Sequence, residues 1–350
     1  MLISELGEFA LIDRLTSDLP PQSPTTIHSV GDDAAVLQPT AGTRTLVTTD
    51  LLLEGIHFDL TYAPLQHLGY KAAQVNFSDI YAMGGMPTQI TVSIGISKRF
   101  SVEDIETLYA GIRTACEEHN VDLVGGDTSA SLTGLAISIT CIGEAKPEDI
   151  VLRSGAKDTD LICVTGDLGA AYMGLQLLER EKSVFYQQQK ESKEPIDFQP
   201  DFAGREYILQ RQLRPEARRD VILALREAGI HPTSMIDISD GLSSELLHIC
   251  KRSGCGCRIY EERIPLDYQT ASMAEEFNLN VITAALNGGE DYELLFTVPL
   301  TLHDRIQQIP SVKVIGRITT PDLGHVLVTR DHSELTLQAQ GWQAQNATTD

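Results

Sequence analysis

Single carboxylates interrupt stretches of this sequence that otherwise consist mainly of small, uncharged residues. Asp79 is the clearest case, because it lies in a helical pattern at residues 71–85 that the Gly84-Gly85 pair ends. Aspartate is a poor helix former and is costly to bury without a partner, and a metal ion would serve as one. Similar carboxylates occur in residues 31–35, 48–50, 125–129 and 237–241. The recurrence predicts one shared, acidic site filled by cations.

Each of these motifs also has an ordinary structural explanation. Gly31-Asp-Asp33 could form a turn or a helix cap, and Asp240 could cap the helix that follows it. The glycines of Gly125-Gly-Asp127 could form a backbone nest for an anion. Taken together, however, the clusters combine carboxylates with Ser or Thr hydroxyls, and oxygen ligands are the ones that Mg²⁺ prefers. The combination favours magnesium.

Magnesium beside glycine-rich turns indicates a nucleoside triphosphate, but the common binding motifs are missing. The sequence has no GxxxxGK[ST] loop, no protein-kinase glycine loop or HRD and DFG pair, and neither HExxH nor GxSxG. Arg153 is the best candidate for a phosphate clamp, although an arginine before a turn is more often an exposed structural residue. Glu290 follows two glycines, which suggests close approach of a ligand. His57 and Trp342 would by default be structural residues.

Composition narrows the class of protein. The 350 residues include 27 basic and 49 acidic side chains, a formal net charge of −22, which has the wrong sign for a nucleic-acid partner. No apolar run is long enough to span a membrane, and the first residues show no basic region followed by an apolar core, so we expect a cytoplasmic protein with no membrane partner. The six cysteines are too sparse for a disulfide framework. Cys250, Cys255 and Cys257 lack the CxxC pair of a zinc site, so we expect free thiols.

Alternating helix and strand patterns predict a mixed α/β (α+β) fold with two domains, residues 1–148 and 149–350. In the first domain we expect helices at 9–15 and 102–118, the latter capped by Ser101 and Asp104, and strands at 34–37, 45–49, 89–96, 122–124 and 135–142. Asp33 and Asp50 should then lie near the ends of neighbouring strands.

The second domain is expected to continue the same alternation. The patterns predict strands at 161–165, 257–260, 292–298, 312–318 and 325–329, and helices at 170–181, 205–212, 215–228 and 243–253. Residues 183–202 are rich in Gln, Lys, Glu and Ser and contain two prolines, so they should form a mobile surface insertion.

The motifs, in their order along the chain, resemble the thiamine-monophosphate kinase family. The resemblance extends from residue 7 to about residue 342 and rests on Gly7-Glu-Phe9, Gly31-Asp-Asp-Ala34, Thr48-Thr-Asp50, Glu54-Gly55, His57-Phe58, Asn76-Phe-Ser-Asp79, Ala82-Met-Gly84, Gly125-Gly-Asp-Thr128, Arg153-Ser-Gly-Ala156, Val164-Thr-Gly166, Ile236-Asp-Ile-Ser-Asp-Gly-Leu242 and Gly288-Gly-Glu-Asp-Tyr-Glu-Leu294. The wider superfamily of aminoimidazole ribonucleotide synthetase, selenophosphate synthetase and a hydrogenase maturation protein shares the Gly-Asp-Asp and Gly-Gly-Asp elements. The later motifs, together with the His57 segment, are similar to the kinase.

The resemblance implies ATP-dependent phosphorylation of thiamine monophosphate to thiamine diphosphate. It also implies the two-domain aminoimidazole ribonucleotide synthetase-like architecture, in a homodimer that pairs through its N-terminal sheets. The family's magnesium ligands correspond to Asp33, Thr48, Thr49, Asp50, Asp79, Asp127, Asp237 and Asp240. Its ATP contacts correspond to Tyr109, Gly126, Asp127, Arg153 and Ser239, and its substrate contacts to His57, Glu290 and Trp342. The insertion at 183–202 is longer than expected of the family.

The expected chemistry requires no general base, because the acceptor phosphate is already largely dianionic at pH 7. No Ser-His-Asp or Cys-His arrangement is evident, and Mg²⁺ with ATP as co-substrate would supply the activation for in-line transfer. Two alternatives remain open. One is another ATP-dependent enzyme of the superfamily, although selenophosphate synthetase would need a reactive cysteine near the N-terminus and the first here is Cys116. The other is a non-catalytic sensor of nucleotide and Mg²⁺.

Overall fold

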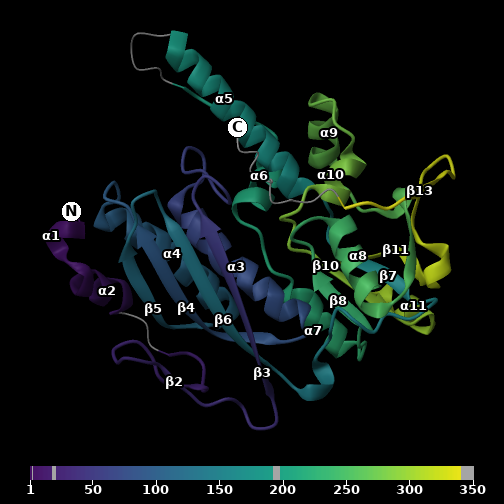
Figure 1. The fold of residues 1–350 in the computed structure, drawn as a ribbon, viewed down its shortest axis with the longest axis horizontal. Coiled ribbons are helices and arrows are strands. Elements are labelled where there is room, and N and C mark those ends of the chain that lie inside the picture. Colours follow the sequence, from purple (N-terminus) through teal and green to yellow (C-terminus); the bar gives the residue numbers. More distant parts are fainter. Residues whose placement is uncertain (2, 18–20, 192–197, 340–350) are drawn as a thin grey trace, which may run out of the picture. The chain divides into compact units, whose positions relative to one another are not determined.

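A computed structural model of the chain describes residues 1, 3–17, 21–191 and 198–339 (Figure 1). The chain divides into two compact units, Met1–Ile150 and Val151–Asp350. Each unit has its own sheet and its own helices, so each is described by itself. The mixed α/β class predicted from the sequence is confirmed in both.

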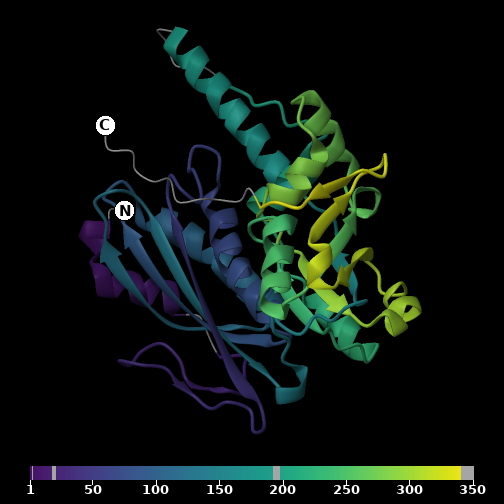
Figure 2. The ribbon, with the colours of Figure 1, turned by 45° about the vertical axis from the view of Figure 1, so that its right-hand side comes forward.

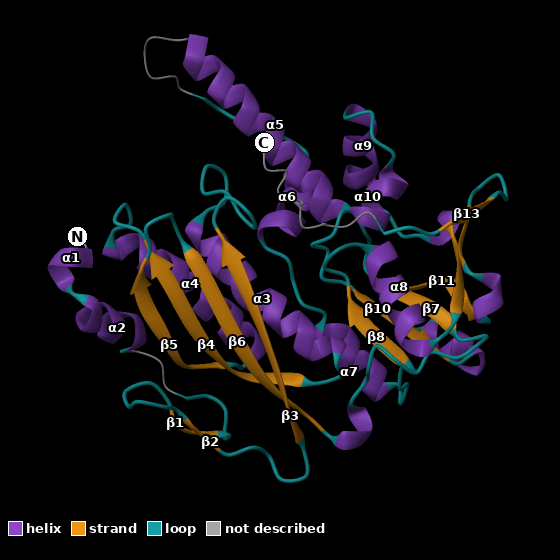
Figure 3. Ribbon diagram, in the orientation of Figure 1, coloured by secondary structure: helices purple, strands orange, loops and turns teal. Residues whose placement is uncertain are grey.

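The first unit is built on a four-stranded sheet in the order β3-β6-β4-β5. Its strands are β3 (Arg44–Leu53), β4 (Met86–Ile96), β5 (Asp122–Ala130) and β6 (Ala136–Ala145), and only the β4–β5 pair is parallel. The long helices α3 (Leu65–Ala82) and α4 (Val102–His119) cover one face of this sheet (Figure 3). Two short helices, α1 (Ile3–Leu6) and α2 (Glu8–Thr16), and a small pair of strands, β1 (Thr26–His28) and β2 (Val36–Leu37), complete the unit.

The two long helices form where the sequence predicts them. Ser101 and Asp104 form the expected capping box at the start of α4, in which Ser101 Oγ accepts from the Asp104 amide and the Asp104 carboxylate accepts from the Ser101 amide. The helices cross closely, because a Cβ added at Gly69 of α3 would lie 1.9 Å from the carbonyl oxygen of Leu108. Glycine at this position therefore lets α3, and with it Asp79, pack tightly on α4.

Strand β3 differs from its prediction. It continues to Leu53, pairs with β6 and places Asp50 opposite Ile139, in the middle of the strand, whereas β2 pairs with β1. The expectation that Asp33 and Asp50 lie at the ends of neighbouring strands is wrong. The physical reason is that alternation continues past the carboxylate: even-numbered residues of β3 face the helices and odd-numbered residues are exposed.

Strand β5 is also longer than predicted. Gly125, Gly126 and Asp127 lie inside the strand, next to Thr91, Val92 and Ser93 of β4, and not in a turn. A Cβ added at Gly126 would lie 1.9 Å from the Val92 carbonyl oxygen. This glycine is therefore required by the close approach of two strands, and the backbone-nest explanation is wrong for the described conformation.

The second unit contains a seven-stranded sheet in the order β13-β12-β9-β11-β7-β10-β8, antiparallel except for the β9–β12 pair. Its strands are β7 (Leu161–Thr165), β8 (Ser234–Asp237), β9 (Gly256–Tyr260), β10 (Leu294–Val298), β11 (Val312–Thr319), β12 (His325–Val328) and β13 (Glu334–Thr336). The helices are α5 (Ala170–Glu191), α6 (Glu206–Leu213), α7 (Arg219–Glu227), α8 (Leu242–Ser253), α9 (Tyr268–Glu276), α10 (Val281–Asn287) and α11 (His303–Ile306). The buried faces of β7, β10 and α8 form its main core.

The polar segment at 183–202 is helical over its first part. Helix α5 continues to Glu191 and extends away from the sheet of its unit (Figure 2), and residues 192–197 lie outside the described part of the chain. The Phe185 ring contacts Tyr186 in a tilted arrangement and Phe198 edge-on, each pair with ring centroids 5.4 Å apart. Gln, Glu and Lys are good helix formers, which explains why a polar composition produces helix here.

Two further expectations can be compared with the described residues. All six cysteines are free thiols, as predicted, and five of them are buried. Within the described ranges, no helix combines the length and the apolar character needed to cross a membrane.

Candidate functional site

The first unit brings two of the predicted carboxylates together. Thr48 and Asp50 lie on the face of β3 that is directed towards the helices, and Asp79 lies on α3. The Thr48 hydroxyl donates a hydrogen bond to Asp79 Oδ2. Burial, with the nearby Asp79 carboxylate, raises the pKa of Asp50 to about 6. Two carboxylates that repel each other when ionised thus lie close together at a half-buried position.

This arrangement fits a divalent cation. A cation bound by both carboxylates would remove the repulsion that raises the pKa of Asp50, and the Thr48 hydroxyl is a further oxygen donor. Among the described residues no group of three or more His, Cys, Asp and Glu is close enough to hold a metal alone. Mg²⁺ usually retains several waters and binds through one or two carboxylates, so the Asp50 and Asp79 pair suits it.

The other predicted ligands of this unit are placed differently. Thr49 lies on the opposite face of β3, where its hydroxyl donates to the Ile139 carbonyl at 3.1 Å. Asp127 is exposed and aligns through Ser93 and Ser138 with residue 51 of β3, one row beyond Asp50. Because alternate rows face opposite sides of a sheet, Asp127 and Asp50 lie on opposite faces. Asp33 is exposed in the bend before β2.

The predicted nucleotide and substrate contacts of the first unit also differ in exposure. Tyr109 is 5% exposed on α4, and burial raises the pKa of its hydroxyl to about 12. Gly126 is exposed on β5. His57 is exposed, and its Nδ1 accepts a hydrogen bond of 2.9 Å from the Leu53 amide. That contact fixes the ring beside the end of β3 and leaves Nε2 available to a ligand.

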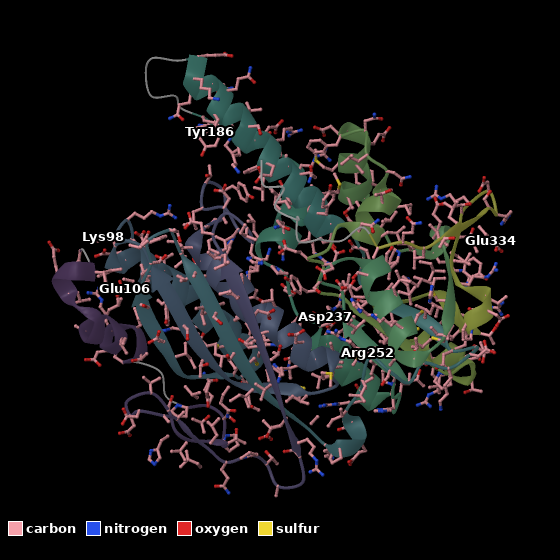
Figure 4. The ribbon with its side chains drawn as sticks, viewed as in Figure 1. Lys98, Glu106, Tyr186, Asp237, Arg252 and Glu334 are labelled. Atoms are coloured by element: carbon pink, nitrogen blue, oxygen red, sulfur yellow. The ribbon has the colours of Figure 1, made fainter. Side chains whose placement is uncertain are left out.

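The second unit brings together a second group of predicted residues. Asp237 ends β8 and is labelled in Figure 4. The segment that follows it lies beside the loop before β10, since the Glu290 amide donates to the Ser239 carbonyl at 2.7 Å and the Tyr292 amide to the Ile238 carbonyl at 2.9 Å. These bonds place Asp237, Ser239 and Glu290 on adjacent backbone segments.

A further carboxylate in this region was not predicted from the sequence. Glu245, in the first turn of α8, is 2% exposed, and its Oε1 accepts from the Asp240 amide at 3.2 Å. Burial, with the nearby Asp240 and Asp237, raises the pKa of Glu245 to about 8. The sequence offers only a weak signal, because a glutamate in the first turn of a helix is ordinary.

The three acids after Gly288-Gly289 have different environments. Glu290 is half-buried, whereas Asp291 and Glu293 are each 1% exposed. Asp291 Oδ2 accepts from the Gly169 amide at 2.8 Å, and burial raises its pKa to about 7. Glu293 pairs with Arg211 and Arg218, each at 2.7 Å. Asp291 and Glu293 are therefore structural.

A cavity of about 280 Å³ adjoins these ion pairs. Three arginines, Arg211, Arg214 and Arg218, line it together with Glu293 and Asp220. Arg218 already pairs with both of these carboxylates, so the cavity is not a strongly positive anion site.

The remaining predicted contacts of the second unit are Arg153 and Trp342. Arg153 is exposed, and the amides of Gly155 and Ala156 just after it each donate to Ser253 Oγ at 3.2 Å, which ties this segment to the end of α8. Trp342 lies outside the described residues.

Comparison with known proteins places this chain in a family. Residues 31–145 match the model of the AIR synthase related protein, N-terminal domain. The chain is 36% identical to the thiamine-monophosphate kinase of Aquifex aeolicus over 91% of this chain and 93% of that protein, and 32% identical to the kinase of Bacillus subtilis over 96% and 99%.

Solved structures give the same result. A structure described as AaThiL complexed with AMPPCP and TMP has a TM-score of 0.71 and 33% identity and covers 98% of both chains. The thiamine-monophosphate kinase of Stenotrophomonas maltophilia has a TM-score of 0.75 at 30% identity, covering 93% of this chain and 96% of that one. A hydrogenase maturation protein HypE, at 19% identity and a TM-score of 0.73, shares the fold alone. Because the chain is 36% and 32% identical to these two kinases over more than 90% of its length, it belongs to the thiamine-monophosphate kinase family.

Proposed function

We propose that this chain transfers the γ-phosphoryl group of ATP to thiamine monophosphate, which yields thiamine diphosphate and ADP. The observation that supports this most strongly is the similarity over 98% of the chain to a structure described with an ATP analogue and TMP. The reaction requires no general base, because the acceptor phosphate is largely dianionic at pH 7 and is itself the nucleophile. No side chain has to remove a proton from it.

The principal barrier is charge repulsion between two phosphates. Two unit charges about 4 Å apart cost about 4 kcal/mol at an effective dielectric of about 20. Mg²⁺, when bound, would neutralise part of this charge and align donor and acceptor for in-line transfer. The pairing of Asp50 and Asp79 beside the Thr48 hydroxyl supports such a role. We propose Asp33, Thr49, Asp127, Asp237 and Asp240 as ligands of further ions; Thr49 and Asp127, on the other face of the sheet from Asp50, would bind an ion other than the one between Asp50 and Asp79.

We further propose that Gly126, Asp127, Arg153, Ser239 and Tyr109 contact ATP, and that His57, Glu290 and Trp342 contact thiamine monophosphate. Tyr109 has the weakest support of these, since its side chain is buried in the first unit. The exposed Nε2 side of His57 and the half-buried Glu290 carboxylate suit a polar, cationic substrate.

An assay of ADP release tests the proposal. The purified chain is given ATP and Mg²⁺ with thiamine monophosphate, with thiamine, with other phosphomonoesters, or with no acceptor. We expect ADP release only with thiamine monophosphate. Release with a different acceptor would indicate another enzyme of the superfamily, and binding of ATP without release under any condition would indicate a nucleotide sensor.

We also propose that the chain forms a homodimer through the sheet of its first unit. Val47, Leu51 and Leu53 are 66%, 53% and 36% exposed on the face of β3 that faces away from the helices. Such a row of apolar residues on an open sheet is typical of an interface.

Replacing Leu51 by glutamate is therefore expected to convert the dimer into a monomer, because each protomer would bury one unpaired carboxylate in the apolar interface. Sedimentation equilibrium measures the change. Leu132→Glu is the matched control, since Leu132 is 99% exposed in the turn between β5 and β6. A wild-type monomer, or a Leu51→Glu dimer as stable as that of the control, would contradict the interface.

Asp50→Asn is expected to raise thermal stability when no Mg²⁺ is present. In the folded state the pKa of Asp50 is raised from 3.8 to about 6, so the protein loses stability as pH rises through this interval and the carboxyl becomes charged. Removal of the charge should raise Tm by about 6 °C at pH 7.5 in EDTA and leave it unchanged near pH 3.5. Added Mg²⁺ should stabilise the wild type but not the variant. An equal Mg²⁺ response in both proteins would remove Asp50 from the ligand set.

A further inference from the structure

One oxygen of the Glu245 carboxylate has no partner. Glu245 lies in the first turn of α8 and is 2% exposed, and its Oε1 accepts from the Asp240 amide at 3.2 Å. Within the part of the chain that the structure describes, Oε2 is buried and accepts no hydrogen bond. Burial of a carboxylate oxygen without a partner is costly, so this oxygen indicates that a ligand, an ion or a water binds beside it.

The surroundings of this oxygen are acidic. The carboxylates of Asp240 and Asp237 lie close enough to Glu245 to raise its pKa. Neither Asp240 nor Glu245 forms an ion pair within the described ranges. The N-terminus of α8 supplies about +0.5 of an elementary charge, which does not balance three carboxylates. A cation would balance this charge, whereas a water or a neutral ligand would not.

The backbone between β8 and α8 is held in place around these carboxylates. The Ser239 carbonyl accepts from the Glu290 amide at 2.7 Å, and the next residue, Asp240, donates its amide to Glu245. Asp240 is exposed, whereas Asp237 is 4% exposed. The three carboxylates thus extend from the surface into the interior of the second unit, on backbone whose position is fixed by hydrogen bonds.

We propose that Glu245 is a further cation-binding residue of the second unit, whose Oε2 contacts a divalent cation held by Asp237 and Asp240, or a water bound to that cation. This inference rests on the proposed function, in which Asp237 and Asp240 bind Mg²⁺. Among the described residues no three carboxylates are close enough to form a ligand set by themselves, which suits Mg²⁺ because it usually retains several waters. Side chains that orient the ligands of a metal change its affinity by about 10- to 100-fold.

The test compares Glu245→Gln with Glu275→Gln, the same substitution at an exposed position on α9 of the same unit. Glutamine keeps an oxygen that can accept from the Asp240 amide, but it removes the charge. Electron paramagnetic resonance measures the binding of Mn²⁺ in the presence of AMPPCP. For Glu245→Gln we expect the dissociation constant of one ion to rise about tenfold. Glu275→Gln should bind Mn²⁺ as the wild type does. An unchanged dissociation constant in Glu245→Gln would overturn the role.

Thermal melting in EDTA separates cation binding from support of the fold. Glu245→Gln replaces a carboxyl group that is buried with one oxygen unpaired, so its Tm in EDTA should equal or exceed that of the wild type. Added Mg²⁺ should then raise the Tm of the variant less than that of the wild type. A lower Tm of the variant in EDTA would show that Glu245 supports the fold, and it would overturn the proposal.

A double-mutant cycle tests whether Glu245 and Asp240 act on the same ion. Once Asp240→Asn has weakened that ion, adding Glu245→Gln should weaken Mn²⁺ binding by less than it does in the wild type. Fully additive losses would overturn the shared site, while ADP release by the wild type with thiamine monophosphate would stand. A wild type that binds no Mn²⁺ and releases no ADP would instead overturn the proposed function, and the role of Glu245 with it.

Discussion

Asp79→Asn is expected to lower turnover by about 1,000-fold, because the site loses a carboxylate that would bind Mg²⁺ beside the transferred phosphoryl group. Asp79 lies beside Asp50 and accepts from Thr48, and asparagine can keep that hydrogen bond through its carbonyl oxygen. The fold should therefore survive. ADP release at saturating Mg²⁺ measures the loss, and circular dichroism with thermal melting checks the fold.

Asp13→Asn is the control for this substitution, since Asp13 is exposed on α2 of the same unit. It should keep full activity. If Asp79→Asn retained near-normal turnover at saturating Mg²⁺, Asp79 would have to be withdrawn as a metal ligand.

Arg211→Met is expected to destabilise the second unit by about 3 kcal/mol, since buried Glu293 would keep only Arg218 as a cationic partner and buried Asp291 would lose the cation that lies 3.9 Å away. Glu293, 1% exposed, would lose a contact of 2.7 Å, and the neighbouring Asp291 carbonyl would lose a donor. Urea unfolding followed by far-ultraviolet circular dichroism measures the change.

Arg205→Met provides the comparison at the start of the same helix. Arg205 pairs at 2.7 Å with Glu276, whose side chain is 43% exposed, and such surface pairs contribute about 1 kcal/mol or less. A loss in Arg211→Met no greater than in Arg205→Met would show that the buried network does not support the loop before β10. Replacing Glu293 by leucine as well as Arg211 by methionine should recover part of the loss, because the buried carboxylate that lost one of its two arginines is then removed.

The sequence predicted those elements whose signals are local. The capping box of α4 lies within four residues, and the helix of Asp79 ends at a glycine pair, so both could be recognised from neighbours in the chain. The mid-strand place of Asp50 could not, because a carboxylate in a strand looks like a strand end unless the helix that faces it is known. For the same reason α5 was predicted to end early, since a polar helix that extends from its sheet has no apolar face to indicate it.

The site was predicted in parts. The motifs predicted one shared site; the structure brings Asp50 and Asp79 together in the first unit and places the backbone after Asp237 beside that of Glu290 in the second. Glu245 was missed because its raised pKa depends on burial beside Asp240 and Asp237, which the neighbouring residues in the sequence do not indicate. The separate environments of Glu290, Asp291 and Glu293 were also hidden, since left-handed residues at 290 and 292 break the alternation that the sequence would suggest.

The proposal that carboxylates of both units hold the catalytic cations is tested most directly by counting bound Mn²⁺. Electron paramagnetic resonance measures the number of ions bound by the wild type, by Asp79→Asn and by Asp237→Asn, each in the presence of AMPPCP and thiamine monophosphate. We expect each substitution to remove or weaken at least one ion bound by the wild type. The same number of ions, bound with the same affinity, in all three proteins would contradict the proposal.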